Sequence, residues 1–109
     1  MGRGSFYFDV SAEGAAVFLG PTEAELMELA WQKGELTVKK ALYFLSENND
    51  RSYTTIMTVL GRLADKGFLL RERQGRSFVY RPASDRETFL EERARRVSAC
   101  LKRNFPHLT

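Results

Sequence analysis

Residues 53–67 constrain this chain more than any other segment, because their apolar residues recur at the spacing of an amphipathic helix. One face of that helix is apolar and consists of Ile56, Val59, Leu60 and Leu63. This spacing predicts a helix with a core-facing stripe. The opposite face lacks the long Glu and Lys side chains that favour exposed helices, and it consists of Thr54, Thr55, Thr58, Gly61 and Arg62. A slim face of hydroxyls is typical of a helix that enters a DNA major groove, where Thr bonds base edges or phosphates. The alternative is an exposed Thr-rich helix without a partner.

The positive charge of the chain is concentrated in the same region. The net charge is only +3, but residues 51–81 carry seven basic and two acidic side chains. Residues 1–50 carry four basic and eight acidic side chains. A basic block on and after the Thr-faced helix is expected for a protein that binds a polyanion. Ordinary solvation of the surface is the alternative explanation.

Composition and length exclude several classes of protein. The length of 109 residues fits one domain, and a hydrophobic content of 43% is enough for a small core. The sequence has no apolar run long enough to span a membrane and no signal peptide, so we expect no membrane insertion and a cytoplasmic location. Cys100 and His107 are the single cysteine and histidine, so we predict no metal site within one chain. We find no nucleophile–base pair and no phosphate-binding glycine loop, and therefore predict neither an enzyme nor a cofactor.

Capping and breaking residues delimit the predicted helices. Thr22 is the predicted N-cap of a first helix, which Gly34 ends. Thr37 is predicted to cap a second helix. The Thr-faced third helix is predicted to begin near Ser52 and to end at Gly67, a residue type that favours the position after a helix C-cap.

A β-hairpin and a further helix are predicted after the third helix. Phe68–Arg73 and Ser77–Arg81 are expected to be extended, with a turn at Gln74–Gly75 between them. Ser84 is predicted to cap the fourth helix. Its apolar stripe is Leu90, Ala94, Val97 and Leu101.

The order of these elements predicts a mainly α fold with a small β-hairpin. Three helices followed by a hairpin form a winged helix-turn-helix, in which the third helix enters the major groove and the hairpin is the wing. The predicted parts of the chain are a leader over residues 1–20, a winged-helix domain over 21–83 and a C-terminal helix over 84–109. The leader has a short strand pattern from Phe6 to Val10, and we expect it to pack on the domain or on a second subunit.

Two strings of residues also carry a resemblance to a known family. Tyr-Thr-Thr-Ile-Met-Thr begins at Tyr53, and Gly-Arg-Ser-Phe-Val-Tyr begins at Gly75. In this order and at this separation they resemble the penicillinase repressor family, which includes the bacterial repressors of β-lactamase and methicillin-resistance genes. The resemblance runs over roughly residues 19–90. It implies a dimeric winged-helix repressor that binds a short inverted repeat, with Thr54, Thr55 and Thr58 on the recognition helix and Arg76 in the wing.

The residues and the resemblance together give a set of predicted contacts. Those predicted to contact double-stranded operator DNA are Arg51, Tyr53, Thr54, Thr55, Thr58, Arg62, Arg73, Arg76, Lys39 and Lys40. Those predicted to join two subunits of a homodimer are Leu90, Ala94, Val97, Leu101 and Phe105. The alternative for this second group is that the stripe packs against its own domain.

The resemblance also implies how such a repressor is regulated. Some members of the family are inactivated when a membrane sensor-protease triggers cleavage in the C-terminal region, so such a partner is implied here. Others respond to copper through pairs of C-terminal cysteines, and the single Cys100 argues against that response. Two alternative functions are a winged helix that contacts another protein, and a winged-helix regulator of a different family that senses another signal.

Overall fold

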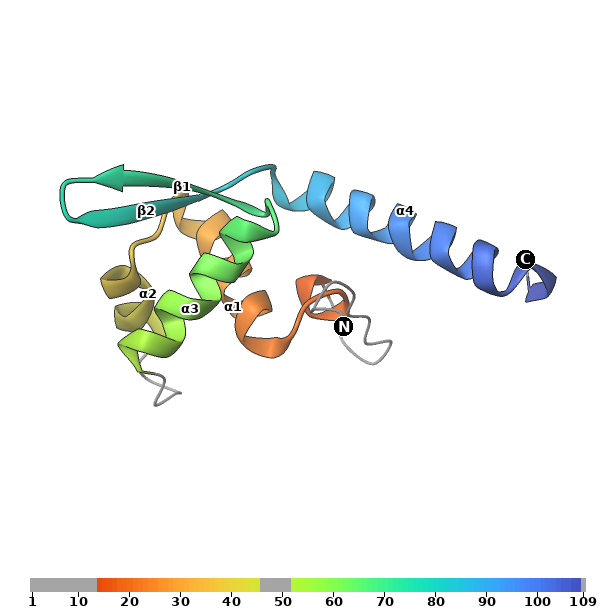
Figure 1. Cartoon of the computed structure of the whole chain (residues 1–109), viewed down its shortest axis with the longest axis horizontal. Helices are drawn as coiled ribbons and strands as arrows, with labels where there is room; N and C mark the ends of the chain where they lie inside the picture. Colours follow the sequence, from red (N-terminus) through yellow and green to blue (C-terminus); the bar gives the residue numbers. More distant parts are fainter. Residues whose placement is uncertain (1–13, 46–51, 109) are drawn as a thin grey trace.

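The computed structural model of the chain describes residues 14–45 and 52–108. Its regular elements, in chain order, are a 3₁₀ helix η1 (Gly14–Val17), α1 (Pro21–Lys33), α2 (Val38–Leu45), α3 (Tyr53–Asp65), β1 (Leu69–Gln74), β2 (Ser77–Pro82), α4 (Arg86–Asn104) and a 3₁₀ helix η2 (Pro106–Leu108). Figure 1 shows α1, α2 and α3 gathered beside the β-hairpin, with α4 projecting away from them. The molecule measures 52 Å along its longest axis and 28 by 27 Å across it. The predicted fold class, a winged helix-turn-helix followed by a helix, is confirmed.

The core lies between the three helices and the base of the hairpin. Its largest fully buried side chains are Leu26, Met27, Leu36, Ile56, Leu60, Leu63 and Leu69. All four residues of the apolar stripe predicted on the third helix are buried. Ala15 and Leu19 are buried as well, so the end of the predicted leader packs on the domain. The predicted strand at residues 6–10 lies outside the described residues. Within the described residues, no helix is long and apolar enough to span a membrane.

Of the three predicted N-caps, Thr37 is confirmed, whereas Thr22 and Ser84 are wrong. The Ser52 side chain accepts a hydrogen bond from the Thr55 backbone N–H, and Thr37 Oγ1 accepts one from the Lys40 N–H at 3.1 Å. Thr22 is not a cap, because α1 begins one residue earlier at a proline, whose fixed φ suits the first helical position.

The fourth helix, by contrast, begins one residue later than predicted. Asp85 is its N-cap in place of Ser84, and Asp85 Oδ1 accepts a 2.7 Å bond from the Thr88 N–H. This bond holds the pKa of Asp85 below its ordinary value. The charge of the Asp85 carboxylate also interacts favourably with the positive end of the helix macrodipole. Ser84 contacts α1 instead, because its backbone carbonyl accepts a 2.9 Å hydrogen bond from Trp31 Nε1.

The hairpin is a two-stranded antiparallel sheet closed by a two-residue turn. Leu69 pairs with Pro82 at its base and Gln74 with Ser77 at its tip. The turn is therefore Gly75–Arg76, one residue later than predicted. Gly75 has a φ of 62°, whereas Arg76 is not among the described residues with a positive φ. This combination fits a type II′ turn.

Backbone hydrogen bonds fasten the hairpin to the helical part of the domain. The Leu36 N–H donates to the Tyr80 carbonyl and the Tyr80 N–H donates to the Leu36 carbonyl, each at 2.8 Å. The link between α1 and α2 therefore pairs with β2. At the base, the Ala83 N–H donates to the Phe68 carbonyl at 3.0 Å. The wing is thus held on both sides near its base, while its tip projects from the domain.

An aromatic cluster joins α4 to the domain. The Phe89 ring is 4% exposed and lies between Trp31 at 5.3 Å and Phe68 at 5.0 Å, measured between ring centroids. The Arg93 guanidinium lies over the Phe68 ring at 5.2 Å, and Arg86 forms a 2.8 Å ion pair with Glu28 of α1. These contacts involve mainly the first two turns of α4 and set the direction in which the helix leaves the domain.

Candidate nucleic-acid interface

The predicted recognition face of α3 is open to solvent. Its five predicted contact residues are all exposed: Tyr53, Thr54, Thr55, Thr58 and Arg62. The opposite face of the same helix is buried in the core. The rest of the chain therefore packs against that face and leaves the predicted recognition face open. The Ser52 hydroxyl donates to Thr55 Oγ1 at 3.1 Å, which leaves the Thr55 hydroxyl free to donate elsewhere. Arg62 forms no ion pair within the described residues. The face therefore offers hydroxyl donors, hydroxyl acceptors and one cation.

Two lysines begin α2 and have different surroundings. Lys40 is half-buried, and its Nζ donates to the Glu35 carbonyl at 3.4 Å. Lys39 is exposed and has no acidic partner among the residues that the structure describes. Of the two predicted phosphate contacts, Lys39 therefore has the freer ammonium group. The predicted contact Arg51 lies outside the described residues.

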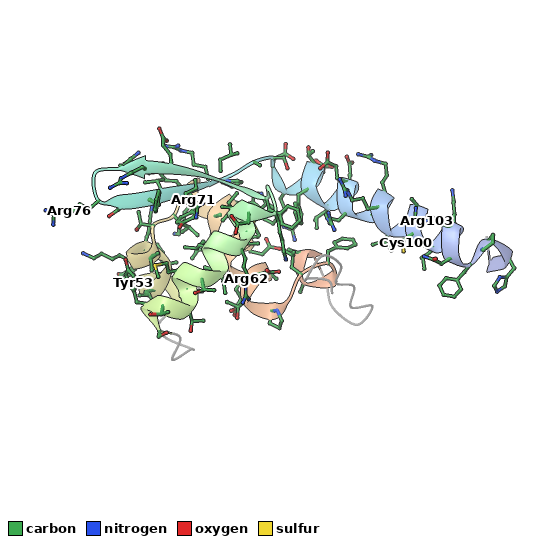
Figure 2. The ribbon with its side chains drawn as sticks, viewed as in Figure 1. Tyr53, Arg62, Arg71, Arg76, Cys100 and Arg103 are labelled. Carbon is green, nitrogen blue, oxygen red and sulfur yellow. The ribbon has the colours of Figure 1, made fainter. Side chains whose placement is uncertain are left out.

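The wing presents its charge at the tip. Arg76 is exposed at the turn, and it has no ion pair in the described part of the chain. Figure 2 shows its side chain extending from the end of the hairpin. Arg73 Nε donates to the Gly75 carbonyl at 3.1 Å, so this arginine folds back on the turn. Arg76 is thus the cation of the wing that reaches furthest into solvent.

Ion pairs divide the basic block of residues 51–81 into two groups. Arg81 pairs with Glu72 and, at 3.2 Å, with Glu35; the hydrogen bond and charge of Glu72 make the larger contribution to the raised pKa of Arg81. Lys66 Nζ lies 3.0 Å from a Glu23 carboxylate oxygen. These two cations are compensated within the domain. The cations near α3 and the wing tip remain available for an external anion.

Arg71 is a cation beside this face that the list of predicted contacts omitted. Its guanidinium lies 5.2 Å from the Phe78 ring centroid, and its Nη1 is 3.8 Å from where a Cβ on Gly61 would stand. Figure 2 shows Arg71 where the hairpin passes α3. The sequence contained a signal for it, because strand alternation puts Arg71 on the same face of β1 as the buried Leu69.

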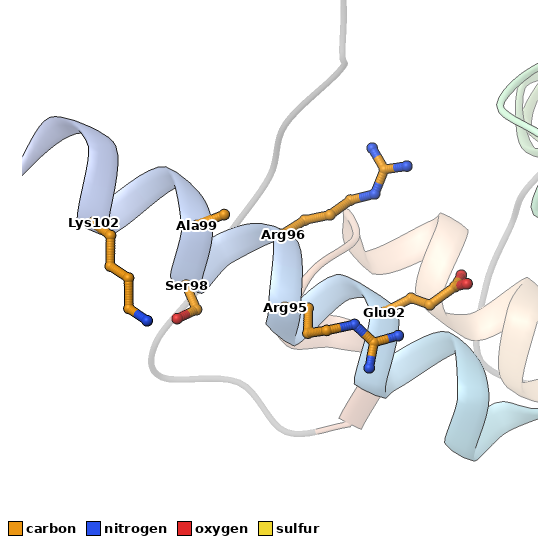
Figure 3. Close-up of a pocket in the computed structure, with 6 residues that line it drawn as sticks. All are labelled: Glu92, Arg95, Arg96, Ser98, Ala99 and Lys102. Carbon is orange, nitrogen blue, oxygen red and sulfur yellow. The ribbon is translucent and has the colours of Figure 1, made fainter.

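The residues predicted to form a dimer interface lie along α4 and have unequal exposure. Val97 is buried within the chain, and Leu90 packs partly against the core. Ala94 is exposed, and Leu101 and Phe105 are 43% and 47% exposed. Ala94 and the far end of the stripe are therefore available to a second subunit, whereas Val97 is not. A hollow of about 550 Å³ also lies on α4 (Figure 3), but its lining comes from this one helix: Glu92, Arg95, Arg96, Ser98, Ala99 and Lys102. It reflects side chains spread along a surface, and we assign it no ligand.

Gly61 permits a direct test of how tightly α3 and the wing approach. We expect Gly61→Ala to raise the free energy of unfolding by about 1 kcal/mol, because glycine is a poor residue in a helix interior. The new methyl would make only ordinary contact with Arg71. Gly75→Ala is the matched control and should lower stability by about 1 kcal/mol, since Gly75 has a positive φ. Urea unfolding measures both, and a loss of stability in both variants would contradict the ordinary contact described at Gly61.

Comparisons with known proteins agree with this geometry. A sequence model of the penicillinase repressor family matches residues 19–107. The transcriptional regulator BlaI of Mycobacterium tuberculosis is 40% identical over 70 residues, which are 63% of this chain and 51% of that protein. The penicillinase repressor of Bacillus licheniformis is 33% identical over 73 residues, which are 67% of this chain and 57% of that protein. The chain thus spans about half the length of the curated relatives it matches.

A solved structure supports the same assignment. The solution structure of the DNA-binding domain of the repressor BlaI superposes with a TM-score of 0.56 and 34% sequence identity, covering 62% of this chain and 82% of that one. The match of the family model spans most of the chain and includes both strings that carried the resemblance. The chain belongs to the penicillinase repressor family.

Proposed function

We propose that this chain is a sequence-specific DNA-binding repressor that acts as a homodimer on an inverted-repeat operator. One observation carries the proposal: the hydroxyls on the outer face of α3 are exposed beside a wing whose tip carries an arginine with no ion pair among the described residues. An exposed face without long side chains fits inside a major groove, while an arginine at the wing tip can reach phosphates or the adjacent minor groove. The names of the relatives support the same function.

The two groups of residues have different tasks in this proposal. Arg62, Arg76 and Lys39 neutralise phosphates, which supplies most of the affinity and makes binding salt-dependent. Thr54, Thr55 and Thr58 contact base edges, and each good contact contributes about 1 to 3 kcal/mol of discrimination between bases. Repression then follows because the bound protein excludes RNA polymerase from the same DNA.

The direction of α4 is compatible with a dimer that spans two half-sites. Half-sites read by such dimers lie about 34 to 36 Å apart, or a multiple of that spacing. A helix of 19 residues is about 28 Å long, and its exposed apolar residues Leu101 and Phe105 lie at the end remote from the domain. Pairing of two chains there would keep their recognition helices well separated. Light scattering at tens of micromolar, without DNA, tests this part, and a monomer would refute it.

Fluorescence anisotropy with the DNA upstream of the gene for this chain tests DNA binding. We expect tight binding that weakens at higher salt, exceeds the binding to a scrambled duplex of equal length and saturates at two chains per site. Equal, weak binding to both duplexes would overturn the proposal. It would favour the alternative of a winged helix that contacts another protein, which pull-down experiments would then address.

Arg76→Ala separates the contribution of the wing from that of α3. Loss of this charge should weaken binding to every duplex alike and reduce the slope of log affinity against log salt by about 0.9 for each bound chain, the value for one phosphate contact. Arg103→Ala is the control, because it removes the same charge from the far end of α4 (Figure 2). The same anisotropy titrations at several salt concentrations give both slopes. Equal slopes for wild type and Arg76→Ala would show that the wing tip does not contact phosphate.

A further inference from the structure

A groove separates the recognition helix from the wing. It has a volume of about 350 Å³ and lies between the first turn of α2, the first turn of α3 and the start of β2. Its lining includes Lys39, Tyr53, Met57, Arg76, Ser77 and Phe78. Figure 2 shows Tyr53 and Arg76 at the same end of the molecule, one on α3 and the other on the wing. The groove thus joins the two surfaces that the proposed function assigns to DNA.

The lining combines two kinds of chemistry within a short distance. Lys39 and Arg76 are exposed cations, and neither has an ion pair among the described residues. Tyr53 and Ser77 add hydroxyl groups that can donate hydrogen bonds. The remaining surface is apolar, since Met57 and Phe78 keep 45% and 42% of their area exposed.

This combination is complementary to the backbone of a nucleic acid strand. Each nucleotide presents one negative phosphate beside a sugar whose surface is largely carbon. A phosphate suits the two cations and the hydroxyls, whereas the sugar suits the thioether and the aromatic ring. An anion without such a carbon surface would leave Met57 and Phe78 in water.

The position of the groove determines which strand of the bound DNA can reach it. If α3 lies in a major groove and the wing tip reaches past the adjacent backbone, the strand between them must cross this part of the surface. We propose that the groove between α2, α3 and β2 seats one phosphate and the adjoining deoxyribose of that strand, an inference that rests on the proposed function. Lys39, Tyr53 and Arg76 are then contacts to one phosphate in each half-site. Tyr53 therefore acts through its hydroxyl on the DNA.

Neutral backbone substitutions test this assignment one phosphate at a time. The probe is the fluorescein-labelled duplex from upstream of the gene, carrying a single methylphosphonate that is moved along each strand. Among the phosphates that wild type contacts in each half-site, we expect one, seated in the groove, where this change weakens binding about tenfold, as for loss of a charge-assisted bond. Lys39→Gln removes the contact from both half-sites, so it should bind the unmodified duplex more weakly by about tenfold for each half-site and lose most of its sensitivity at that position. Lys102→Gln, which changes an exposed lysine of α4, should keep the sensitivity of wild type.

Three outcomes are distinguishable. If Lys39→Gln loses its sensitivity at one position where wild type and Lys102→Gln keep theirs, the groove is the phosphate site. If wild type binds its duplex but Lys39→Gln remains sensitive at every position to the same extent, the groove is not the site, although the chain still binds DNA. If wild type does not distinguish the duplex from a scrambled one, the proposed function fails and this inference fails with it. Urea unfolding of Lys39→Gln should match that of wild type, because Lys39 is exposed.

Discussion

Thr58→Glu is expected to abolish DNA binding without loss of stability. Thr58 is exposed in the middle of the proposed recognition face, so a carboxylate there would lie against the DNA. Juxtaposed like charges cost several kcal/mol, and we expect affinity to fall at least about a hundredfold, or ~3 kcal/mol. The folded state should gain slightly, because Glu is a better helix former than Thr and the new carboxylate would lie one turn before Arg62.

A control with the same charge change elsewhere shows whether the loss of DNA binding depends on the position of Thr58. Gln32→Glu adds the same charge to α1, at an exposed site beside Arg86. Anisotropy should show near wild-type binding for this control and none for Thr58→Glu, and circular dichroism should show both variants to be folded. Retention of tight binding by a folded Thr58→Glu protein would exclude α3 from the DNA interface and leave the wing as the remaining candidate.

Phe89→Ala is expected to produce the largest loss of stability among the substitutions considered. The ring is almost fully buried between Trp31 and Phe68, and replacing such a phenylalanine by alanine typically costs about 3 to 5 kcal/mol. Part of this cost comes from the two aromatic contacts, each worth about 0.5 to 1.5 kcal/mol beyond the buried area. Because the cluster holds α4 on the domain, trypsin should also cleave faster after Arg93, Arg95 and Arg96.

Leu101→Ala provides the comparison for Phe89→Ala. Leu101 lies on the same helix but is 43% exposed, so at concentrations where the chain is monomeric its replacement should change stability by less than about 1 kcal/mol. Urea unfolding gives both values. Similar losses in the two variants would mean that the aromatic cluster contributes little to the attachment of α4.

Local patterns in the sequence predicted α3 almost completely. Its buried stripe follows from a period of 3.6 residues, and Ser52 and Gly67 mark its ends through well-defined cap chemistry. The end at Gly67 is confirmed by bonds from the Gly67 N–H to the Ala64 carbonyl and from the Phe68 N–H to the Leu63 carbonyl. Such features depend on neighbours within a few residues, which a sequence displays directly.

Features that depend on distant residues were not predictable in the same way. The sequence cannot show that Lys66 meets Glu23, 43 residues away, and so it cannot show which cations of the basic block are already neutralised. The apolar stripe of α4 was predicted incompletely for the same reason, because it omitted Phe89. Phe89 is buried because Trp31 and Phe68 stand opposite it, whereas the periodicity alone favoured Leu90 as the first residue of the stripe.

The way the wing is fastened determines which part of it can vary. Its base is fixed by the paired bonds between Leu36 and Tyr80 and by the bond from Ala83 to Phe68, while nothing lies within 4 Å of where a Cβ on Gly75 would stand. Residues inserted at the turn would lengthen the hairpin without disturbing the core, since doubling the length of a loop costs only about 0.6 kcal/mol in closure entropy. The span of DNA that such a domain covers can therefore diverge among homologues independently of the sequence that α3 reads.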